Sequence, residues 1–136
     1  MKIQLESNAI MPTRAHATDA GLDLYAPYTQ EIPPKRSATF DTGVHIQLPE
    51  GTAGLLVSKS GLNCNHSLTS TGLIDEGYTG GIRVTLHNHS NLWYRVKKGD
   101  KISQLVIVPV IRPELELVDK LDDTERGDNG FGSSGR

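Results

Sequence analysis

The chain has 136 residues and holds only one cysteine, Cys64, which excludes an internal disulfide framework and a cysteine-rich zinc site. It lacks any apolar run near the ~18 residues that a membrane-spanning helix needs. Its amino terminus alternates polar and apolar residues, whereas a signal peptide needs a continuous apolar stretch. Basic residues are not in excess, since 14 Lys and Arg face 16 Asp and Glu, and nucleic-acid-binding proteins are normally basic. We therefore expect a cytoplasmic protein that binds neither membranes nor nucleic acid.

Helical periodicity is also missing. No stretch of about twelve residues carries a helical apolar stripe, and residues 61–65 allow one short helical turn at most. Instead, 14 glycines and 7 prolines divide the chain into short segments of alternating apolar and polar residues, such as 44–48 and 82–87. A more continuous apolar segment covers 102–108, and a later strand is expected around Leu115 and Leu117. This pattern predicts a single all-β domain, built as a sandwich, jelly roll or barrel.

The end of the chain has a different composition. Residues 126–136 read RGDNGFGSSGR, which cannot bury enough surface to order itself, so we expect a domain over 1–125 and a flexible arm over 126–136. An inert disordered terminus is the alternative. The arm holds a literal GxGxxG, but a dinucleotide fingerprint also needs a preceding strand and a following helix. Its backbone N–H groups, its serines and Arg126 can still bind phosphates.

Two carboxylates flank a glycine in segment 17–24. Asp19 is placed to hydrogen-bond a turn at Gly21. Asp23 could then face a site, where a carboxylate suits hydrated Mg²⁺, a cation that keeps its waters and takes few protein ligands. The alternative is a surface turn with a structural aspartate.

Segment 58–61, Ser-Lys-Ser-Gly, follows an apolar run. A cation, two hydroxyls and a glycine in one short turn can cradle a polyphosphate. A Ser-Lys nucleophilic pair is another interpretation, although nothing else in the chain supports acyl transfer.

Segment 72–82 reads as a hairpin with Asp75 on its approach and Tyr78 between glycines at its tip. Asp75 could orient and deprotonate a water, while Tyr78 packs on a sugar. A simple turn with a capping aspartate is the alternative. In segment 99–105, Gln104 interrupts an apolar strand, and its side chain must be satisfied by backbone or by a ligand.

Taken together and in this order, five segments resemble the motifs of the trimeric deoxyuridine triphosphatase (dUTPase) family. They are 17–24, 58–62, 72–80, 99–105 and 126–135. The resemblance implies a distorted jelly-roll subunit of the β-clip type and a homotrimer in which each active site takes residues from all three subunits. It also implies that the Gly-rich arm closes over a site on a neighbouring subunit.

The resemblance further implies hydrolysis of dUTP to dUMP and pyrophosphate, which keeps uracil out of DNA and supplies dUMP for thymidylate synthesis. Asp75 would position the attacking water, Gln104 and Arg126 would complete the catalytic set, and Asp23 would hold Mg²⁺ through a coordinated water. The expected substrate-binding residues are Lys59, Ser60, Gly61, Thr69, Gly72, Leu73, Ile74, Tyr78, Arg83, Phe131, Gly132, Ser133 and Ser134. Some members of the family are carried by viruses and have protein partners, so a host-cell cytoplasm and a further partner stay open.

Two other functions compete with this one. Deoxycytidine triphosphate deaminases share the fold but use a glutamate on the strand after the hairpin, where this chain has Thr85, which cannot act as a general base. A binding or regulatory module that has lost turnover is the other. Lys59 favours this second alternative, because the family usually has arginine at that position and lysine lacks the fork geometry of a guanidinium group.

Overall fold

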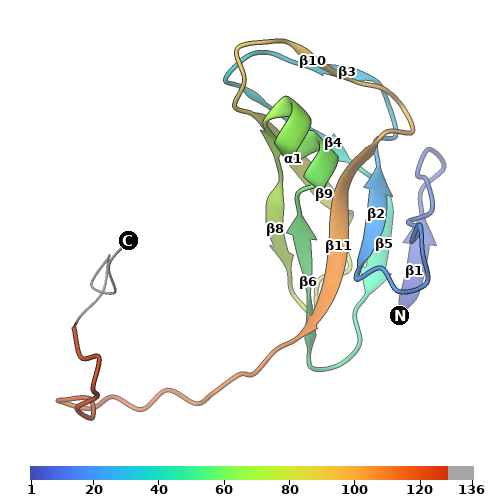
Figure 1. The fold of residues 1–136 in the computed structure, drawn as a ribbon. Helices are drawn as coiled ribbons and strands as arrows, with labels where there is room; N and C mark the ends of the chain where they lie inside the picture. Colours follow the sequence, from blue (N-terminus) through green and yellow to red (C-terminus); the bar gives the residue numbers. More distant parts are fainter. Residues whose placement is uncertain (129–136) are drawn as a thin grey trace.

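The computed structural model describes residues 1–128 of the chain, which form a body of short strands with one short helix (Figure 1). The strands are β1 (Lys2–Leu5), β2 (Gly21–Tyr25), β3 (Gln30–Ile32), β4 (Ser37–Asp41), β5 (Val44–Gln47), β6 (Thr52–Val57), β7 (Leu68–Thr69), β8 (Thr71–Ile74), β9 (Arg83–Asn88), β10 (Tyr94–Val96) and β11 (Lys101–Pro109); the helix is α1 (Ser60–His66). The expected all-β class is confirmed. No helix within 1–128 is long and apolar enough to cross a membrane.

The strands pair in antiparallel fashion in four small sheets. The largest has the order β2-β11-β6-β8, and a second has the order β4-β9-β7; β1 pairs with β5, and β10 with β3. β11 runs between β2 and β6, so both of its backbone edges are paired, and most of its side chains are buried or partly buried (Figure 1). β8 is an edge strand, so one row of its backbone N–H and C=O groups faces away from the sheet.

The core follows the period-two pattern of the sequence. On β4, Ala38 and Phe40 are buried and their neighbours are exposed, and on β9 the same alternation buries Val84 and Leu86. Gly54 of β6 faces the core where two strands approach closely. A Cβ at this position would lie 2.9 Å from Leu105 Cδ1, so only glycine fits without a shift of the leucine.

Helix α1 is longer than the single turn that the sequence suggested. It spans seven residues, none of them proline or β-branched, and Leu62 packs against the core. It ends where Ser67 adopts a left-handed conformation with φ 54° and donates its N–H to the Asn63 carbonyl at 3.0 Å.

The expected strand around Leu115 and Leu117 is wrong for the isolated chain. After β11 the chain leaves the body as an extended segment, and no strand forms between residues 110 and 128 (Figure 1). Both leucine side chains are almost fully exposed, and Ile111 and Leu121 of the same segment are largely exposed. A strand needs a neighbour to pair its backbone groups, and the segment has none within the described chain.

Candidate active site

An open pocket of about 410 Å³ lies between β8, β9 and the turn that joins them. Its lining residues are Leu56, Thr71, Gly72, Leu73, Ile74, Asp75, Tyr78, Gly81, Ile82, Arg83 and Thr85. The structure thus brings together six of the residues that the sequence analysis assigned to substrate binding or catalysis in and just after segment 72–82. The hairpin expected there is wrong, because β8 pairs with β6 and β9 pairs with β4 and β7, so the turn joins strands of two different sheets. Thr71 and Thr85 also line the pocket. The sequence did not predict this role, which follows from their positions on β8 and β9.

Asp75 sits at the mouth of this pocket, directly after β8. Its carbonyl accepts the N–H of Tyr78 at 3.0 Å, which closes the turn. Its carboxylate is exposed and makes no hydrogen bond or ion pair with any side chain of residues 1–128. An unpaired carboxylate beside a pocket can accept a hydrogen bond from a water molecule and orient it.

Tyr78 is held over the pocket by the turn itself. Its hydroxyl donates to the Gly81 carbonyl at 3.0 Å. The ring lies so close to Gly80 that a Cβ there would come within 2.5 Å of the Tyr78 oxygen. The ring therefore occupies space that any side chain at residue 80 would fill.

β8 supplies the wall that could read a base. Leu73 of this strand is 64% exposed, and the outer backbone groups of β8 have no strand partner. Unpaired backbone donors and acceptors on an edge strand can pair with the edge of a flat ligand.

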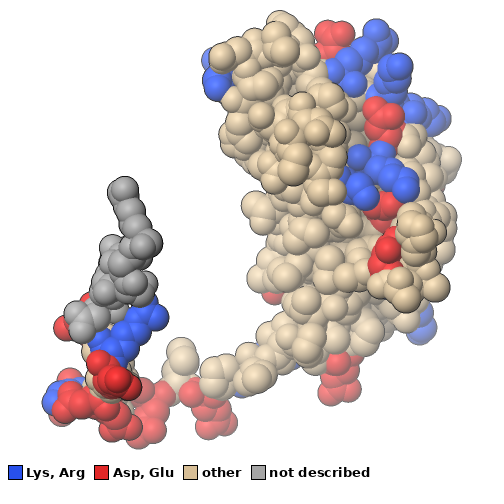
Figure 2. All heavy atoms as spheres, viewed as in Figure 1, with Lys and Arg blue, Asp and Glu red and all other residues tan. Residues whose placement is uncertain are grey.

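A second cluster of polar residues forms where β2, β11 and the start of α1 meet. The Asp23 side chain is only 6% exposed, yet its Oδ1 lies 2.5 Å from Lys59 Nζ and its Oδ2 lies 2.8 Å from Lys101 Nζ. Burial raises the pKa of Asp23, but hydrogen bonds from Lys101 and Lys59 outweigh burial and hold that pKa below its ordinary value. The same carboxylate raises the pKa of Lys101. Figure 2 shows lysines and arginines gathered beside β2 and β11, whereas the face over α1 and β8 carries few charges.

Gln104 stands beside Asp23, because the two residues are direct partners across β11 and β2. Its Nε2 donates to the Ser58 carbonyl at 3.2 Å. A Cβ at Gly21 would lie 3.0 Å from Gln104 Oε1, so the amide packs on the strand below it. Asp23, Lys59 and Gln104 thus meet although they lie far apart in the sequence.

The turn that carries Ser60 and Gly61 is anchored by buried hydroxyls that the sequence did not reveal. Ser58 Oγ donates to the Ser70 carbonyl at 3.0 Å and accepts the Ser70 N–H at 2.9 Å, and Ser70 Oγ lies 2.9 Å from Ser103 Oγ. This network ties the end of β6 to β8 and β11. A Cβ on Gly61 would meet nothing within 4 Å, so the space above the start of α1 is open.

Within residues 1–128, the polar cluster does not contribute to the lining of the pocket beside Asp75. None of Asp23, Lys59, Ser60, Gly61 and Gln104 lines the pocket beside Asp75.

Some nominated residues lie elsewhere. Thr69 is on β7, outside the pocket lining, and its hydroxyl lies 2.7 Å from His89 Nε2. Arg83 lines the pocket but is largely exposed, and its Nε lies 3.6 Å from Asp41 Oδ2. Arg126 belongs to the extended segment beyond β11. Phe131, Gly132, Ser133 and Ser134 lie outside the described residues.

The residues present fit a magnesium ion that a carboxylate contacts through a coordinated water and not directly. No group of three or more His, Cys, Asp or Glu within 1–128 could hold a metal ion. Asp23 is the single buried carboxylate of the polar cluster, and both of its oxygens face lysines. Mg²⁺ commonly keeps several waters and is bound by one or two carboxylates together with substrate phosphates, so Asp23 can serve it through a water.

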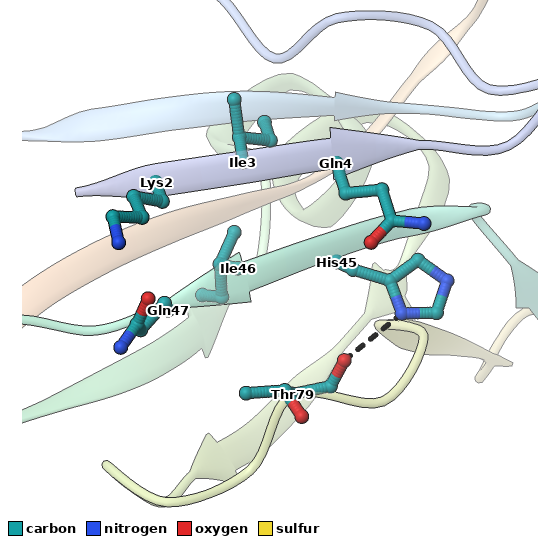
Figure 3. Close-up of a pocket in the computed structure, with 7 residues that line it drawn as sticks. All are labelled: Lys2, Ile3, Gln4, His45, Ile46, Gln47 and Thr79. Atoms are coloured by element: carbon teal, nitrogen blue, oxygen red, sulfur yellow. Dashed lines mark hydrogen bonds between the residues drawn. The ribbon is translucent and has the colours of Figure 1, made fainter.

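A further pocket, of about 320 Å³, lies beside β1 and β5 (Figure 3). There His45 Nδ1 donates to the Thr79 carbonyl at 2.9 Å, and its Nε2 lies 3.1 Å from Glu6 Oε1. The Thr79 carbonyl, and after it Glu6, raise the pKa of His45. His45 thereby ties the amino-terminal strand pair to the β8–β9 turn that carries Tyr78.

The described chain is thus a β-sheet protein with an open pocket along an edge strand and a separate polar cluster that holds two lysines, an arrangement suited to a ligand with a flat polar group and an anionic group. The sequence profile of the dUTPase family matches residues 7–135. The deoxyuridine 5′-triphosphate nucleotidohydrolase of Gloeothece citriformis is 47% identical over 135 residues, covering 97% of this chain and 93% of that protein. The human mitochondrial enzyme of the same name is 44% identical over 134 residues, covering 98% of this chain and 53% of that protein. The chain belongs to the dUTPase family.

Solved structures agree with this assignment. The dUTPase of Staphylococcus bacteriophage 80α with dUpNHpp superposes with a TM-score of 0.92 at 36% identity, covering 99% of this chain and 98% of that chain. A mutant of the dUTPase from Staphylococcus aureus phage phi11, described with a structural Mg(II) ion, has a TM-score of 0.81 at 33% identity, covering 88% and 96%. The jelly-roll fold expected from the resemblance is confirmed.

Proposed function

We propose that this chain hydrolyses dUTP to dUMP and pyrophosphate. The observation that carries this proposal is the unpaired Asp75 carboxylate at the mouth of a pocket whose wall is an edge strand. Asp75 orients a water for attack on the α-phosphorus and accepts a hydrogen bond from the sugar 3′-hydroxyl.

The pocket selects a deoxyuridine. Backbone groups of Gly72, Leu73 and Ile74 on the free edge of β8 pair with uracil, while the Tyr78 ring packs on deoxyribose and leaves no room for a 2′-hydroxyl. Mispaired backbone groups can reject cytosine by roughly 10⁴ or more, whereas one methyl group in an apolar pocket is worth only about 10–200-fold. Thymine is therefore rejected mainly by a rigid clash with its methyl group.

The polar cluster receives the phosphates. Lys59, Ser60, Gly61 and Gln104 border the open space at the start of α1, where they contact the phosphate chain. Bound Mg²⁺ supplies positive charge to the phosphoryl group under attack. Asp23 accepts a hydrogen bond from a water of that ion.

The two clusters are joined by assembly into a homotrimer, so that the pocket of one subunit meets the polar cluster of a neighbour. The separation of the clusters within residues 1–128 supports this proposal. So does the extended segment after β11, whose exposed apolar side chains gain a partner on a second copy of the chain. They are Ile111, Leu115, Leu117, Val118 and Leu121.

Residues 126–136 act as an arm that closes over the assembled site. Phe131 stacks on uracil, and Arg126, Gly132, Ser133 and Ser134 grasp the terminal phosphates. Closure expels water, which strengthens each polar contact with the phosphates. Residues 1–125 supply the remainder of the site.

Pyrophosphate release from dUTP in the presence of Mg²⁺, measured beside dCTP, dTTP and UTP, tests this function. We expect rapid release from dUTP alone and loss of at least about a hundred-fold in kcat for Asp75→Asn, because the base role of a positioned carboxylate contributes about 10²–10⁴-fold. Glu50→Gln, an exposed carboxylate outside the pocket, is the matched control and keeps the wild-type rate. Equal release from dUTP and dCTP, or an unchanged rate for Asp75→Asn, would contradict the proposal.

A further inference from the structure

The buried Asp23 carboxylate is paired with two lysines, one more than is required to neutralise its charge. One carboxylate faces two ammonium groups, so these three paired groups carry a net charge of 2 − 1 = +1, and the Asp19 carboxylate acts on Lys101 from farther away. A buried carboxylate must be paired, but a single lysine is enough for that purpose. The second lysine is surplus for the fold and available for an anion.

The geometry lets either lysine leave without disturbing the other. Lys59 is on Oδ1 at 2.5 Å and Lys101 is on Oδ2 at 2.8 Å, so the two ammonium groups do not share an oxygen. They come from different elements, Lys59 from the turn before α1 and Lys101 from the first position of β11.

Lys59 is the lysine placed to move. It precedes Ser60 and Gly61, beside the open space above the start of α1, and its side chain makes no capping bond to the helix. Lys101 stands in the sheet opposite Tyr25, next to a register shift of β11 that lies between Lys101 and Ser103. Such a shift re-aims side chains at a fixed place on a strand, here toward Asp23.

We propose that Lys101 is a positioning residue, which keeps the Asp23 carboxylate paired while Lys59 turns from that carboxylate to the phosphate chain of the nucleotide. The inference rests on the proposed function, because it assigns Lys59 to the substrate phosphates. Lys101 itself stays on Asp23 and touches no substrate. The sequence did not nominate Lys101, since its side chain meets Asp23 only through the pairing of β11 with β2.

Removal of Lys101 follows directly from this arrangement. In Lys101→Met, Lys59 is the only partner of the buried carboxylate, and its transfer to a phosphate leaves that charge unpaired. Nucleotide binding is expected to weaken by at least about ten-fold, because breaking a buried pair is strongly unfavourable. Lys101→Arg keeps the charge and restores binding to within about three-fold of wild type.

A double-mutant cycle with Asp23 separates this role from direct phosphate contact. Binding of a dUTP analogue with nitrogen in place of the α,β-bridging oxygen is measured by calorimetry in EDTA, so that no metal contributes. In the Asp23→Asn background there is no charge to keep paired and Lys59 is already released. Adding Lys101→Met then changes the dissociation constant by less than about two-fold.

Lys98→Met is the matched control. It removes an exposed lysine in the turn just before β11, away from Asp23, and leaves the dissociation constant unchanged. Thermal melting is recorded for every variant, because a purely structural role for Lys101 would lower the melting temperature without weakening binding.

Each outcome of the double-mutant cycle either supports or overturns the proposed role of Lys101. Weaker binding in Lys101→Met, rescue by arginine and no further effect in the Asp23→Asn background support the proposal. Equal losses in both backgrounds mean that Lys101 contacts the phosphates, and no loss in either means that it only stabilises the fold; both overturn the proposal. If Lys101→Met does not fold, Lys101→Gln, which keeps a polar side chain at this half-exposed position, takes its place in both backgrounds. A wild-type protein that neither binds the analogue nor hydrolyses dUTP refutes the proposed function instead.

Discussion

The Tyr78 ring occupies space that any side chain at residue 80 would fill, which makes Gly80→Ala a sharp perturbation. The new Cβ would lie 2.5 Å from the Tyr78 oxygen, 2.6 Å from Cζ and 2.9 Å from Cε2, all closer than atoms approach in real structures. Because the tyrosine is partly exposed, the ring can swing away and the backbone can stay. The hydrogen bond from its hydroxyl to the Gly81 carbonyl is then lost.

The expected magnitudes follow from these contacts. Loss of one hydrogen bond lowers the free energy of unfolding by about 1 kcal/mol, which lowers Tm by a few degrees in a domain of this size. Loss of the aromatic contact with the sugar is worth about 0.5–1.5 kcal/mol, so the KM for dUTP rises by roughly 2–13-fold. The preference for dUTP over UTP falls in the same variant, because the displaced ring no longer fills the place of a 2′-hydroxyl.

Steady-state kinetics with dUTP and UTP, together with thermal melting, check this prediction. Gly77→Ala is the matched control in the same turn, since a Cβ there meets nothing within 4 Å and the residue has no positive φ. Tyr78→Phe removes the hydroxyl and leaves the ring, so it keeps most of the sugar preference. A Gly80→Ala enzyme with wild-type KM and wild-type discrimination against UTP would show that the ring does not contact the sugar.

Three further predictions address the fold, the pH dependence and the arm. Gly54→Ala places a Cβ 2.9 Å from Leu105 Cδ1 in the buried sheet, so the free energy of unfolding should fall by about 1–3 kcal/mol in urea titrations, and an unchanged midpoint would contradict the packing. The raised pKa of His45, caused first by the Thr79 carbonyl, means that its stabilisation is complete below the ordinary value of about 6.5 and is lost as pH rises through the raised pKa. His45→Gln should therefore remove part of the fall in Tm on the alkaline side of neutrality, and an identical pH profile would refute this role. Truncation before Arg126 should leave Tm and oligomeric state unchanged and abolish most hydrolysis, whereas full activity would exclude the arm from the site.

Much of the fold was predictable, because alternating burial is a local property of each strand. Ile46 and Val84 occupy apolar positions of the alternating segments 44–48 and 82–87, and both are buried as expected. The segment around Leu115 has the same apolar character but finds no partner strand within the described chain, so its pattern predicted a strand that one chain alone does not form. The length of α1 also escaped the sequence analysis, since packing of Leu62 extends it beyond one turn.

The site was predictable where its residues are neighbours in sequence. Asp75 and Tyr78 belong to one turn, and the structure places both at one pocket. Lys101 was missed, because its approach to Asp23 depends on strand register across β2 and β11, which no spacing within one segment reveals. The role of Thr69 as a substrate-binding residue stays a prediction: the structure places it outside the lining of the pocket, with its hydroxyl 2.7 Å from His89 Nε2.

The central claim is that the pocket of one subunit and the polar cluster of another make one dUTPase site. Subunit mixing tests it most directly. Asp75→Asn and Gln104→Leu proteins, each inactive alone, are unfolded together, refolded at equal concentrations and assayed for pyrophosphate release from dUTP. Random assembly pairs an intact pocket with an intact neighbouring cluster at about one quarter of the sites, so the account predicts about 25% of wild-type activity. No recovered activity from properly assembled mixed oligomers would contradict it, because sites built within single chains cannot complement each other.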